Sequence, residues 1–400
     1  MKKLLPCVVG LGYVGLPVFI SLKKKFRVIG FDLNKERVKD LNKLIDTNNE
    51  YNKKELKLIN DSKITNNENE IRDCNFFIVT VPTPIKQNKL PDLKYIISAF
   101  KTISKYIKND DIVFLESTVF PGTTENICKK IIERKKKIKF YLGYSSERIN
   151  PGDKINNIKN IHKVVAIKRD KKNFPVIKKI YKNISKKLIF SQNIKEAELS
   201  KLIENTQRDL NIALMNEIMI LCHKTNLDFK EVIKLARSKW NFLKFNPGLV
   251  GGHCLPVDPY YLSYYAKKIK FKTKVTLAGR DINNFMEKFI YKKIYDKILK
   301  IKKYNDKKIV IAGLTYKPNV ADLRNSLAVK IFKKLKRKIS NIIAYDPTIN
   351  EKTSKNLNFE KNFHKIKNAD TFIFLVKHNK FKSLYSYAKK NNKIVIDPFA

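Results

Sequence analysis

The loop around Cys254 carries the most distinctive chemistry in the sequence. Residues 246–259 contain three glycines, three prolines and no lysine, in a chain with 84 basic residues. Such a loop holds backbone amides around one side chain, and His253 and Asp258 lie within four residues of the thiol. We therefore predict that Cys254 is a nucleophile, with a structural thiol as the alternative.

The remaining four cysteines are scattered along the chain. Together with Cys254 their number is odd, and their spacing fits neither a disulfide framework nor a metal site, so we predict no bound metal. We expect these four to be small buried hydrophobic residues. They are Cys7, Cys74, Cys128 and Cys222.

A G-x-G-x-x-G pattern near the N-terminus predicts a dinucleotide site. Gly10 permits a tight turn, Gly12 lets the backbone approach a pyrophosphate, and Gly15 lets a helix pack on the preceding strand. Asp32 ends the strand predicted over residues 27–31 and stands 22 residues after Gly10, where an acid accepts hydrogen bonds from the ribose. Because a carboxylate repels a 2′-phosphate, NAD is favoured over NADP. The alternative is that Asp32 only begins a turn.

The elements that position these residues alternate between strands and helices. In an open α/β sheet the ligand lies beyond the carboxyl ends of the strands. We therefore predict that Thr83 and Thr118 contact the cofactor or the substrate, with a role as helix N-caps as the alternative. A further strand leads to the polar segment 145–153. The strands are predicted over residues 4–9, 75–81, 111–116 and 140–144.

One long helix is predicted over residues 195–223, and we expect it to carry much of the core. Lys201 and Asn205 stand four apart and share a face, which Arg208 and Asp209 extend, with a solvated charge stripe as the alternative. Eight apolar residues have helical spacing: Leu199, Leu202, Ile203, Leu210, Ala213, Leu214, Ile218 and Leu221.

The C-terminal third predicts a second Rossmann-like domain that lacks the glycine pattern. Strands are predicted over 309–312, 342–347 and 370–376, with a turn at 313–318 and a helix that opens at 322–326. The predicted fold class is α/β, with two Rossmann-like domains joined by a long central helix.

The formal charge of +47 suggests nucleic acid, but its make-up argues against it. Of the basic residues 73 are lysine and 11 arginine, whereas nucleic-acid readers depend on the planar guanidinium. The lysines spread along the whole chain with Ile and Asn, which indicates compositional drift. No run is long enough for a membrane span, and the N-terminus enters the glycine turn without a signal cleavage site. We therefore expect a cytoplasmic protein without nucleic-acid binding or membrane insertion.

Together these motifs resemble the UDP-sugar 6-dehydrogenases of the UDP-glucose/GDP-mannose dehydrogenase family, in order and across nearly the whole chain. The segments 147–153 and 247–254 most resemble the branch that acts on UDP-N-acetylhexosamines, the Vi-antigen type of surface polysaccharide synthesis. The segments that carry the resemblance are 10–17, 117–119, the Lys201/Asn205 helix, 251–258 and 313–318.

The resemblance implies a four-electron oxidation of a C6 alcohol to a carboxylate with two NAD⁺. Cys254 would form a thiohemiacetal and then a thioester, Lys201 and Asn205 would stabilise the oxyanion, and Asp258 would transfer protons. Glu147 and Thr118 would position or activate the hydrolytic water. The implied cofactor-binding residues are Gly10, Gly12, Tyr13, Val14, Gly15, Asp32, Thr83 and Thr118. The implied UDP-sugar-binding residues are Glu147, Arg148, Lys201, Asn205, Gly251, Lys317 and Arg324.

The same resemblance implies three domains: an NAD-binding domain over 1–194, a central helical domain over 195–302 that forms a homodimer, and a UDP-sugar-binding domain over 305–400. Two departures stand out. Ser146 replaces a proline common in relatives, and the chain lacks the Arg-bearing extension often found after the last strand, which puts substrate affinity in doubt.

Several alternatives stay open. UDP-GlcNAc and its epimer UDP-GalNAc are not separated by the sequence, and UDP-glucose or UDP-N-acetylmannosamine are further candidate substrates. A β-hydroxyacid-type dehydrogenase would pair a similar N-terminal fold with a Lys-Asn helix but would use no cysteine. A basic nucleic-acid-binding protein is the alternative from a different class.

Overall fold

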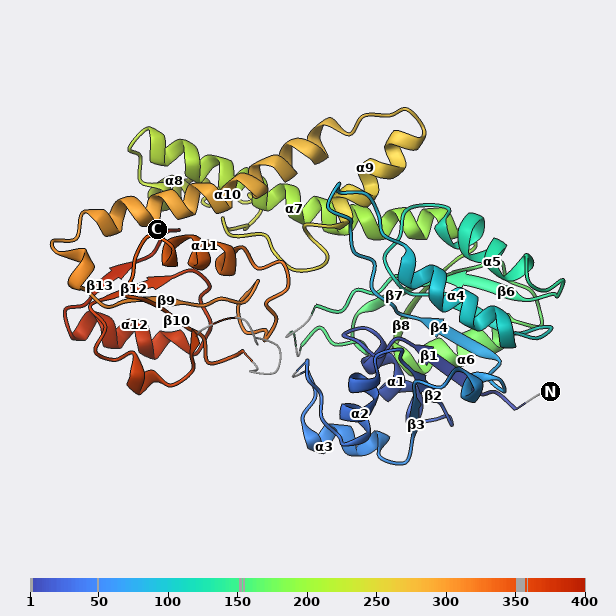
Figure 1. The fold of residues 1–400 in the computed structure, drawn as a ribbon. Helices are drawn as coiled ribbons and strands as arrows, with labels where there is room; N and C mark the ends of the chain where they lie inside the picture. Colours follow the sequence, from blue (N-terminus) through green and yellow to red (C-terminus); the bar gives the residue numbers. More distant parts are fainter. Residues whose placement is uncertain are drawn as a thin grey trace. The chain divides into compact units, whose positions relative to one another are not determined.

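The computed structural model describes residues 3–48, 50–150, 153, 155–349, 357 and 359–399. The chain divides into two compact units, Met1–Glu204 with Tyr260–Phe271, and Asn205–Pro259 with Lys272–Ala400 (Figure 1). Pro151 and Gly152 of the predicted polar segment lie outside the described residues. The division into three domains stays a prediction.

The first unit is built on an eight-stranded sheet of order β3-β2-β1-β4-β5-β6-β7-β8. Strands β1 to β6 are parallel, β7 is antiparallel to β6, and β8 is parallel to β7. The order reverses between β1 and β4, as in a Rossmann fold. The strands are β1 Pro6–Val9, β2 Ile29–Phe31, β3 Lys63–Thr65, β4 Phe76–Val79, β5 Ile112–Leu115, β6 Tyr141–Tyr144, β7 His162–Ile167 and β8 Lys187–Ser191.

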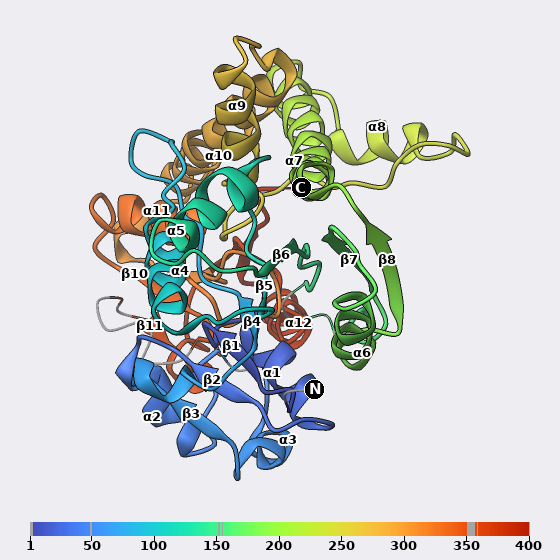
Figure 2. The same cartoon turned by 90° about the vertical axis from the view of Figure 1, so that its right-hand side faces the viewer.

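Helices cover both faces of this sheet (Figure 2). Alternate strand residues point to opposite faces, so Val8 and Ile78 join the core under α1 and α6, whereas Cys7 and Phe77 join the core under α4 and α5. The helices of this unit are α1 Gly15–Lys23, α2 Lys35–Asn42, α3 Lys53–Leu56, α4 Lys94–Tyr106, α5 Lys129–Glu133 and α6 Phe174–Ile184.

The second unit holds a parallel sheet of order β11-β10-β9-β12-β13, which confirms the second Rossmann-like fold. Helices α10 and α11 bury one face and α12 the other. The strands are β9 Ile309–Ala312, β10 Ile342–Tyr345, β11 Phe359–Glu360, β12 Thr371–Phe374 and β13 Ile394–Ile396. The helices are α8 Phe229–Ala236, α10 Lys274–Leu299, α11 Leu327–Lys336 and α12 Phe381–Lys390.

Two helices each contain residues of both units. Helix α7, Ile194–Lys224, matches the predicted helix within one residue at each end, and α9 is Asp258–Lys268. Strands β1, β2, β4, β5, β6, β9, β10 and β12 lie where they were predicted, whereas β3, β7, β8 and β11 were not predicted. In the described part of the chain, no helix is both long and apolar enough to cross a membrane.

Two expectations need correction. Of the apolar positions on α7, Ile203, Leu214 and Leu221 are 51–57% exposed, because helical spacing shows which residues share a face but not whether another element covers it. The helix predicted from residue 322 begins instead at Leu327. Residues 322–325 precede it as a loop, and the Ser326 side chain caps it by accepting a hydrogen bond from Val329 N–H.

Candidate active site

The glycine turn after β1 has the geometry that its sequence predicts. Gly10 has φ +90°, and its N–H donates to Phe31 O at 2.8 Å. A Cβ on Gly15 would lie 1.8 Å from Gly10 O, so the helix can approach the strand only with glycine there. A Cβ on Gly12 would meet nothing within 4 Å. The protein itself therefore does not require glycine at position 12, and the turn leaves room for a ligand.

Asp32 lies at the end of β2 and holds this turn in place. Its Oδ2 accepts from Leu11 N–H at 2.8 Å and its Oδ1 from Asn34 N–H at 2.8 Å. These two bonds show that Asp32 holds the turn, and its contact with the ribose stays a prediction. Sequence reasoning missed Arg37, a buried side chain whose Nε donates to Leu11 O at 2.9 Å and whose Nη1 pairs with Asp46 at 2.8 Å. A basic residue five positions after the acid was the available signal.

Three threonines follow strands β4 and β5: Thr80, Thr83 and Thr118. Thr83 and Thr118 are half-buried, and neither is an N-cap, because Leu93 precedes α4 and Gly122 precedes the next helical turn. The N-cap alternative is therefore wrong for both. Thr80 was not predicted: its hydroxyl donates to Gly10 O at 2.6 Å and fixes the glycine turn.

Glu198 on α7 clamps the loop that follows Thr118. Its carboxylate accepts from Gly122 N–H at 2.5 Å and from Thr124 N–H at 2.8 Å. The side chain is fully buried, and burial raises its pKa to about 7 despite these two donors. The loop that carries Thr118 is thus tied to the helix that carries Lys201.

Glu147 lies in a buried ionic cluster. Its Oε2 is 2.8 Å from Lys163 Nζ, and Lys163 in turn is 2.9 Å from Glu116 Oε2. Burial alone would lower the pKa of Lys163, but the charges of the two carboxylates outweigh it and raise that pKa. Arg148, the next residue, pairs with Glu204 of α7. Its predicted contact with the substrate would compete with that ion pair.

The predicted stripe on α7 is only partly one surface. Lys201 is buried and Asn205 half-buried, whereas Arg208 points to solvent. Asp209 is fully buried and pairs with Arg280 of α10 at 2.6 Å. Arg208 therefore does not belong to this face.

Asn205 and Asp258 belong to the same hydrogen-bonded group as Cys254. Asn205 Nδ2 donates to Asp258 Oδ2, and Asp258 N–H donates to Cys254 O at 2.8 Å. Asp258 is the first residue of α9 and is buried. Cys254 is exposed. The other four cysteines are buried, as predicted.

Residues far away in sequence hold the loop before Cys254. Asn325 Nδ2 donates to Gly252 O at 3.0 Å, and His253 Nε2 lies 2.9 Å from Asp322 Oδ2. Arg324 also pairs with Asp322 at 2.9 Å. Burial would raise the pKa of Asp322, but the hydrogen bonds and charge of His253 and Arg324 hold it well below its usual range.

The start of the same loop is clamped by Asn216 of α7, which sequence reasoning missed. Its Oδ1 accepts from Gly248 N–H at 2.8 Å, and its Nδ2 donates to Gly248 O at 3.1 Å and to Asn283 Oδ1 at 2.8 Å. Asn283 continues the chain of hydrogen bonds to Asp209. An asparagine among the apolar residues of a helix was the only signal.

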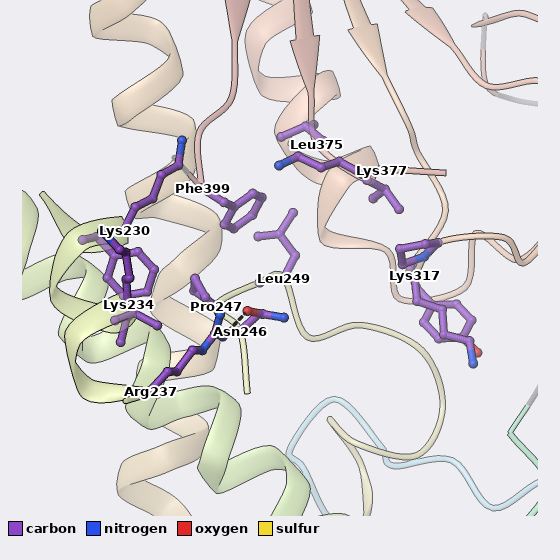
Figure 3. A pocket seen from close by; sticks show the side chains of 16 residues that line it. Lys230, Lys234, Arg237, Asn246, Pro247, Leu249, Lys317, Leu375, Lys377 and Phe399 are labelled. Atoms are coloured by element: carbon purple, nitrogen blue, oxygen red, sulfur yellow. Dashed lines mark hydrogen bonds between the residues drawn. The ribbon is translucent and has the colours of Figure 1, made fainter. Parts of the chain in front are cut away.

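A cavity of about 550 Å³ lies in the second unit beside Gly248 (Figure 3). Its walls include residues 316–318 after β9 and 375–377 after β12, the two strands between which the sheet order reverses. That is the place where open α/β sheets bind ligands. Among the described residues that line it, none is acidic and five are basic: Lys230, Lys234, Arg237, Lys317 and Lys377.

Comparison with known families covers most of the chain. Three profiles match in order: an NAD binding domain over residues 5–185, a central domain over 195–285 and a UDP binding domain over 310–400. The chain belongs to the UDP-glucose/GDP-mannose dehydrogenase family. This confirms the resemblance, the NAD cofactor and the activity class, an NAD-dependent nucleotide-sugar dehydrogenase.

Individual members of this family are similar over nearly their whole lengths. A UDP-N-acetyl-D-glucosamine 6-dehydrogenase from Pseudomonas aeruginosa is 41% identical over 359 residues, which cover 87% of this chain and 84% of that protein. One from Salmonella typhi is 39% identical, with 95% and 91% covered. The solved structure of a UDP-D-ManNAc dehydrogenase from Pyrococcus horikoshii has a TM-score of 0.84, 30% identity, and 98% and 95% coverage.

The residues of the dehydrogenase's first unit fit NAD. The open space at Gly12 and the N-terminus of α1 can take a pyrophosphate, and Asp32 lies where the ribose hydroxyls would be. In the UDP binding domain, the basic cavity at the sheet reversal suits a nucleoside diphosphate in charge and in place.

Proposed function

We propose that this dehydrogenase oxidises C6 of a UDP-N-acetylhexosamine from alcohol to carboxylate, in two steps that each reduce one NAD⁺. The observation that carries the proposal is the exposed Cys254, held in a loop that is hydrogen-bonded at Gly248, Gly252 and His253. A one-step alcohol dehydrogenase would need no such thiol. The β-hydroxyacid alternative is therefore disfavoured.

The thiol retains the aldehyde between the two oxidations. The first hydride leaves C6 and gives the aldehyde. Attack by Cys254 Sγ then forms a C–S bond and a thiohemiacetal, which can give up a second hydride and become a thioester. Water finally forms a C–O bond as the C–S bond breaks, and the carboxylate leaves with the thiol restored. NAD, when bound, supplies the acceptor for both hydrides.

We assign roles in this reaction to the other predicted catalytic residues. Asn205 and Asp258 are hydrogen-bonded to each other, and Asp258 N–H donates to the backbone carbonyl of Cys254, so both belong to the hydrogen-bonded group that holds Cys254. We assign Asn205, with Lys201 from one turn earlier on α7, to the oxyanion of the tetrahedral species and Asp258 to proton transfer. Glu147 and Thr118 would activate the water that hydrolyses the thioester.

The nucleotide part of the substrate is assigned to the basic cavity of the UDP binding domain. Lys317 and Gly248 both line it, and the chain runs from Gly248 through Gly251 to Cys254. A Cβ on Gly251 would lie 2.7 Å from Asn325 O, so this stretch of backbone packs closely. Arg324 is exposed and is oriented by Asp322, which leaves its guanidinium able to reach a phosphate.

The names of the relatives support an N-acetylhexosamine as the sugar. The two similar enzymes from Pseudomonas aeruginosa and Salmonella typhi act on UDP-N-acetyl-D-glucosamine, which makes UDP-GlcNAc the first substrate to test and surface polysaccharide synthesis the expected pathway. UDP-GalNAc, UDP-ManNAc and UDP-glucose complete the panel. A kcat/KM for UDP-glucose above that for every N-acetylated sugar would refute the assignment.

We also propose that the enzyme is a cytoplasmic homodimer. The support is apolar surface at the central helices. Four leucines there are each more than half exposed: Leu214 and Leu221 of α7, Leu227 of the connection to α8, and Leu235 of α8. Light scattering of the purified protein tests the dimer, and a monomer at micromolar concentration would contradict it.

The stoichiometry of NADH tests the four-electron reaction. We expect two NADH per UDP-sugar consumed, and loss of complete turnover in Cys254→Ser. A serine hydroxyl attacks the aldehyde less readily than a thiol, and the oxygen ester that it would form hydrolyses more slowly than a thioester. Cys222→Ala, which removes a buried thiol elsewhere, is the matched control and keeps the ratio of two. A ratio near one, or full turnover in Cys254→Ser, would refute the proposal.

A further inference from the structure

Lys163 is a buried cation that the reaction as assigned so far does not use. It is the second residue of β7 and is only 2% exposed. Burying an ammonium is costly unless charges and hydrogen bonds compensate it, and here two carboxylates do so, Glu147 at 2.8 Å and Glu116 at 2.9 Å. The chain has 73 lysines, and among those that the structure describes only Lys163 and Lys201 are buried, Lys163 the more completely.

The sheet register explains how Lys163 comes to face Glu147. Strand β7 runs antiparallel to β6, with Gly143 opposite Ile167 and Tyr144 opposite Ala166. Continuing that register by three residues brings position 147 opposite position 163. Glu116 directly follows β5, the parallel neighbour of β6. Because β7 runs antiparallel to β6, its second residue, Lys163, lies at the carboxyl edge of the parallel strands, where Glu116 and Glu147 also lie.

Three hydrogen bonds fix the orientation of the Glu147 carboxylate. Oε1 accepts from the N–H groups of Arg148 at 2.8 Å and Ile149 at 2.7 Å, and Oε2 contacts Lys163. A carboxylate has about four acceptor sites, and these three donors occupy three of them. The remaining site, on Oε2, is the one that could receive a proton from water.

We propose that Lys163 is a positioning residue for thioester hydrolysis, which fixes the Glu147 carboxylate and leaves its remaining Oε2 acceptor site for the attacking water. This inference rests on the proposed function, because it needs a thioester on Cys254. In the step it serves, the water oxygen bonds to the thioester carbon, the C–S bond breaks, and the water proton passes to Glu147. Without Lys163, Glu116 and Glu147 lose the cation between them, and like charges at close range drive one carboxyl to keep a proton.

Lys163→Met tests the inference through the two halves of the reaction. In a stopped-flow experiment with saturating NAD⁺ and UDP-GlcNAc, we expect a burst of two NADH per active site at a rate within about twofold of wild type. The steady state should then fall at least about tenfold, since general-base catalysis contributes a factor of this order or more. Mass spectrometry of quenched enzyme should show an acyl adduct on Cys254.

Two further variants separate positioning from simple structural support. Tyr181→Phe removes the hydrogen bond of 2.8 Å to Glu116 but leaves the Lys163–Glu147 contact, so its steady state should stay within about threefold of wild type. Lys163→Arg keeps the cation and should restore most of the steady-state rate. If Lys163→Met does not fold, Lys163→Met/Glu116→Gln carries the test, because it removes one of the two buried acids.

The outcomes distinguish this inference from the function on which it rests. Equal loss of burst and steady-state rates in Lys163→Met without an adduct, or an equal loss in Tyr181→Phe, would overturn the role of Lys163. The wild-type enzyme would still release two NADH per substrate in that case. A ratio of one in the wild type would instead overturn the four-electron reaction itself.

Discussion

Asn216 gives the sharpest test of how the loop before Cys254 is held. Its side chain is fully buried on α7 and makes three hydrogen bonds: two with the backbone of Gly248 and one with Asn283. The Asn216 amide thus donates one hydrogen bond to the backbone of Gly248 and accepts another from it, as the backbone of a neighbouring β-strand would. Asn216→Ala removes all three bonds and leaves no polar group in their place.

The expected cost follows from those bonds. Each contributes on the order of 1 kcal/mol net, so the free energy of unfolding should fall by about 3 kcal/mol. The loss should also free the start of the loop that leads to Cys254. We therefore expect faster alkylation of Cys254 by iodoacetamide and a lower kcat.

Urea unfolding followed by far-ultraviolet circular dichroism measures the change in stability. Fluorescence is less suitable because Trp240, the single tryptophan, is 92% exposed in the folded chain. The matched control is Asn211→Ala, on the same helix, whose amide makes only an exposed hydrogen bond to Gln207 O. A loss below about 1 kcal/mol for Asn216→Ala, or an equal loss for Asn211→Ala, would refute the assignment of the clamp.

Two more predictions concern the first unit. Gly15→Ala places a Cβ 1.8 Å from Gly10 O and should lower both the melting temperature and the affinity for NAD. Gly12→Ala meets nothing within 4 Å and should lower the affinity for NAD alone. Calorimetry with NAD and a thermal melt would separate the two effects, and an equal fall in melting temperature for both variants would contradict the geometry. For Glu198, the pKa of about 7 in the folded chain exceeds its usual 4.5, so the unfolded chain releases its proton first as pH rises. Wild type should lose about 3 kcal/mol relative to Glu198→Gln between pH 4.5 and pH 7, and parallel pH profiles would show that Glu198 does not titrate in this way.

The second Rossmann-like fold shows how far local sequence can go. Gly313 at the end of β9 has φ +88°, and Leu314 N–H donates to Asp346 Oδ2 at 2.8 Å, the same arrangement as Gly10, Leu11 and Asp32. Strands of apolar residues that end at a glycine could be read from the sequence because both features are local. That Asp346 is fully buried and lies 3.0 Å from His378 could not be read from the sequence, since His378 is 32 residues away.

Charged residues mark the limit of sequence reasoning for this protein. Glu147 and Arg148 were both identified as site residues, but their partners Lys163 and Glu204 were not, and neither was Asp322 as the partner of His253. No pattern in the sequence separates Lys163 from the other lysines, because burial of a charge depends on which opposite charges the sheet register brings beside it.

The sequence by itself determined the strand-turn-helix order, the glycine turn, and Cys254 as the chemically distinct thiol. These depend on backbone stereochemistry and on residue types within a few positions of each other. Only the tertiary structure decided which polar groups are buried and paired: Asn216 with Gly248, Glu198 with Gly122, and Lys163 with Glu147. Those pairs join residues 16 to 76 positions apart, and each is stable only because the packed elements around it exclude water.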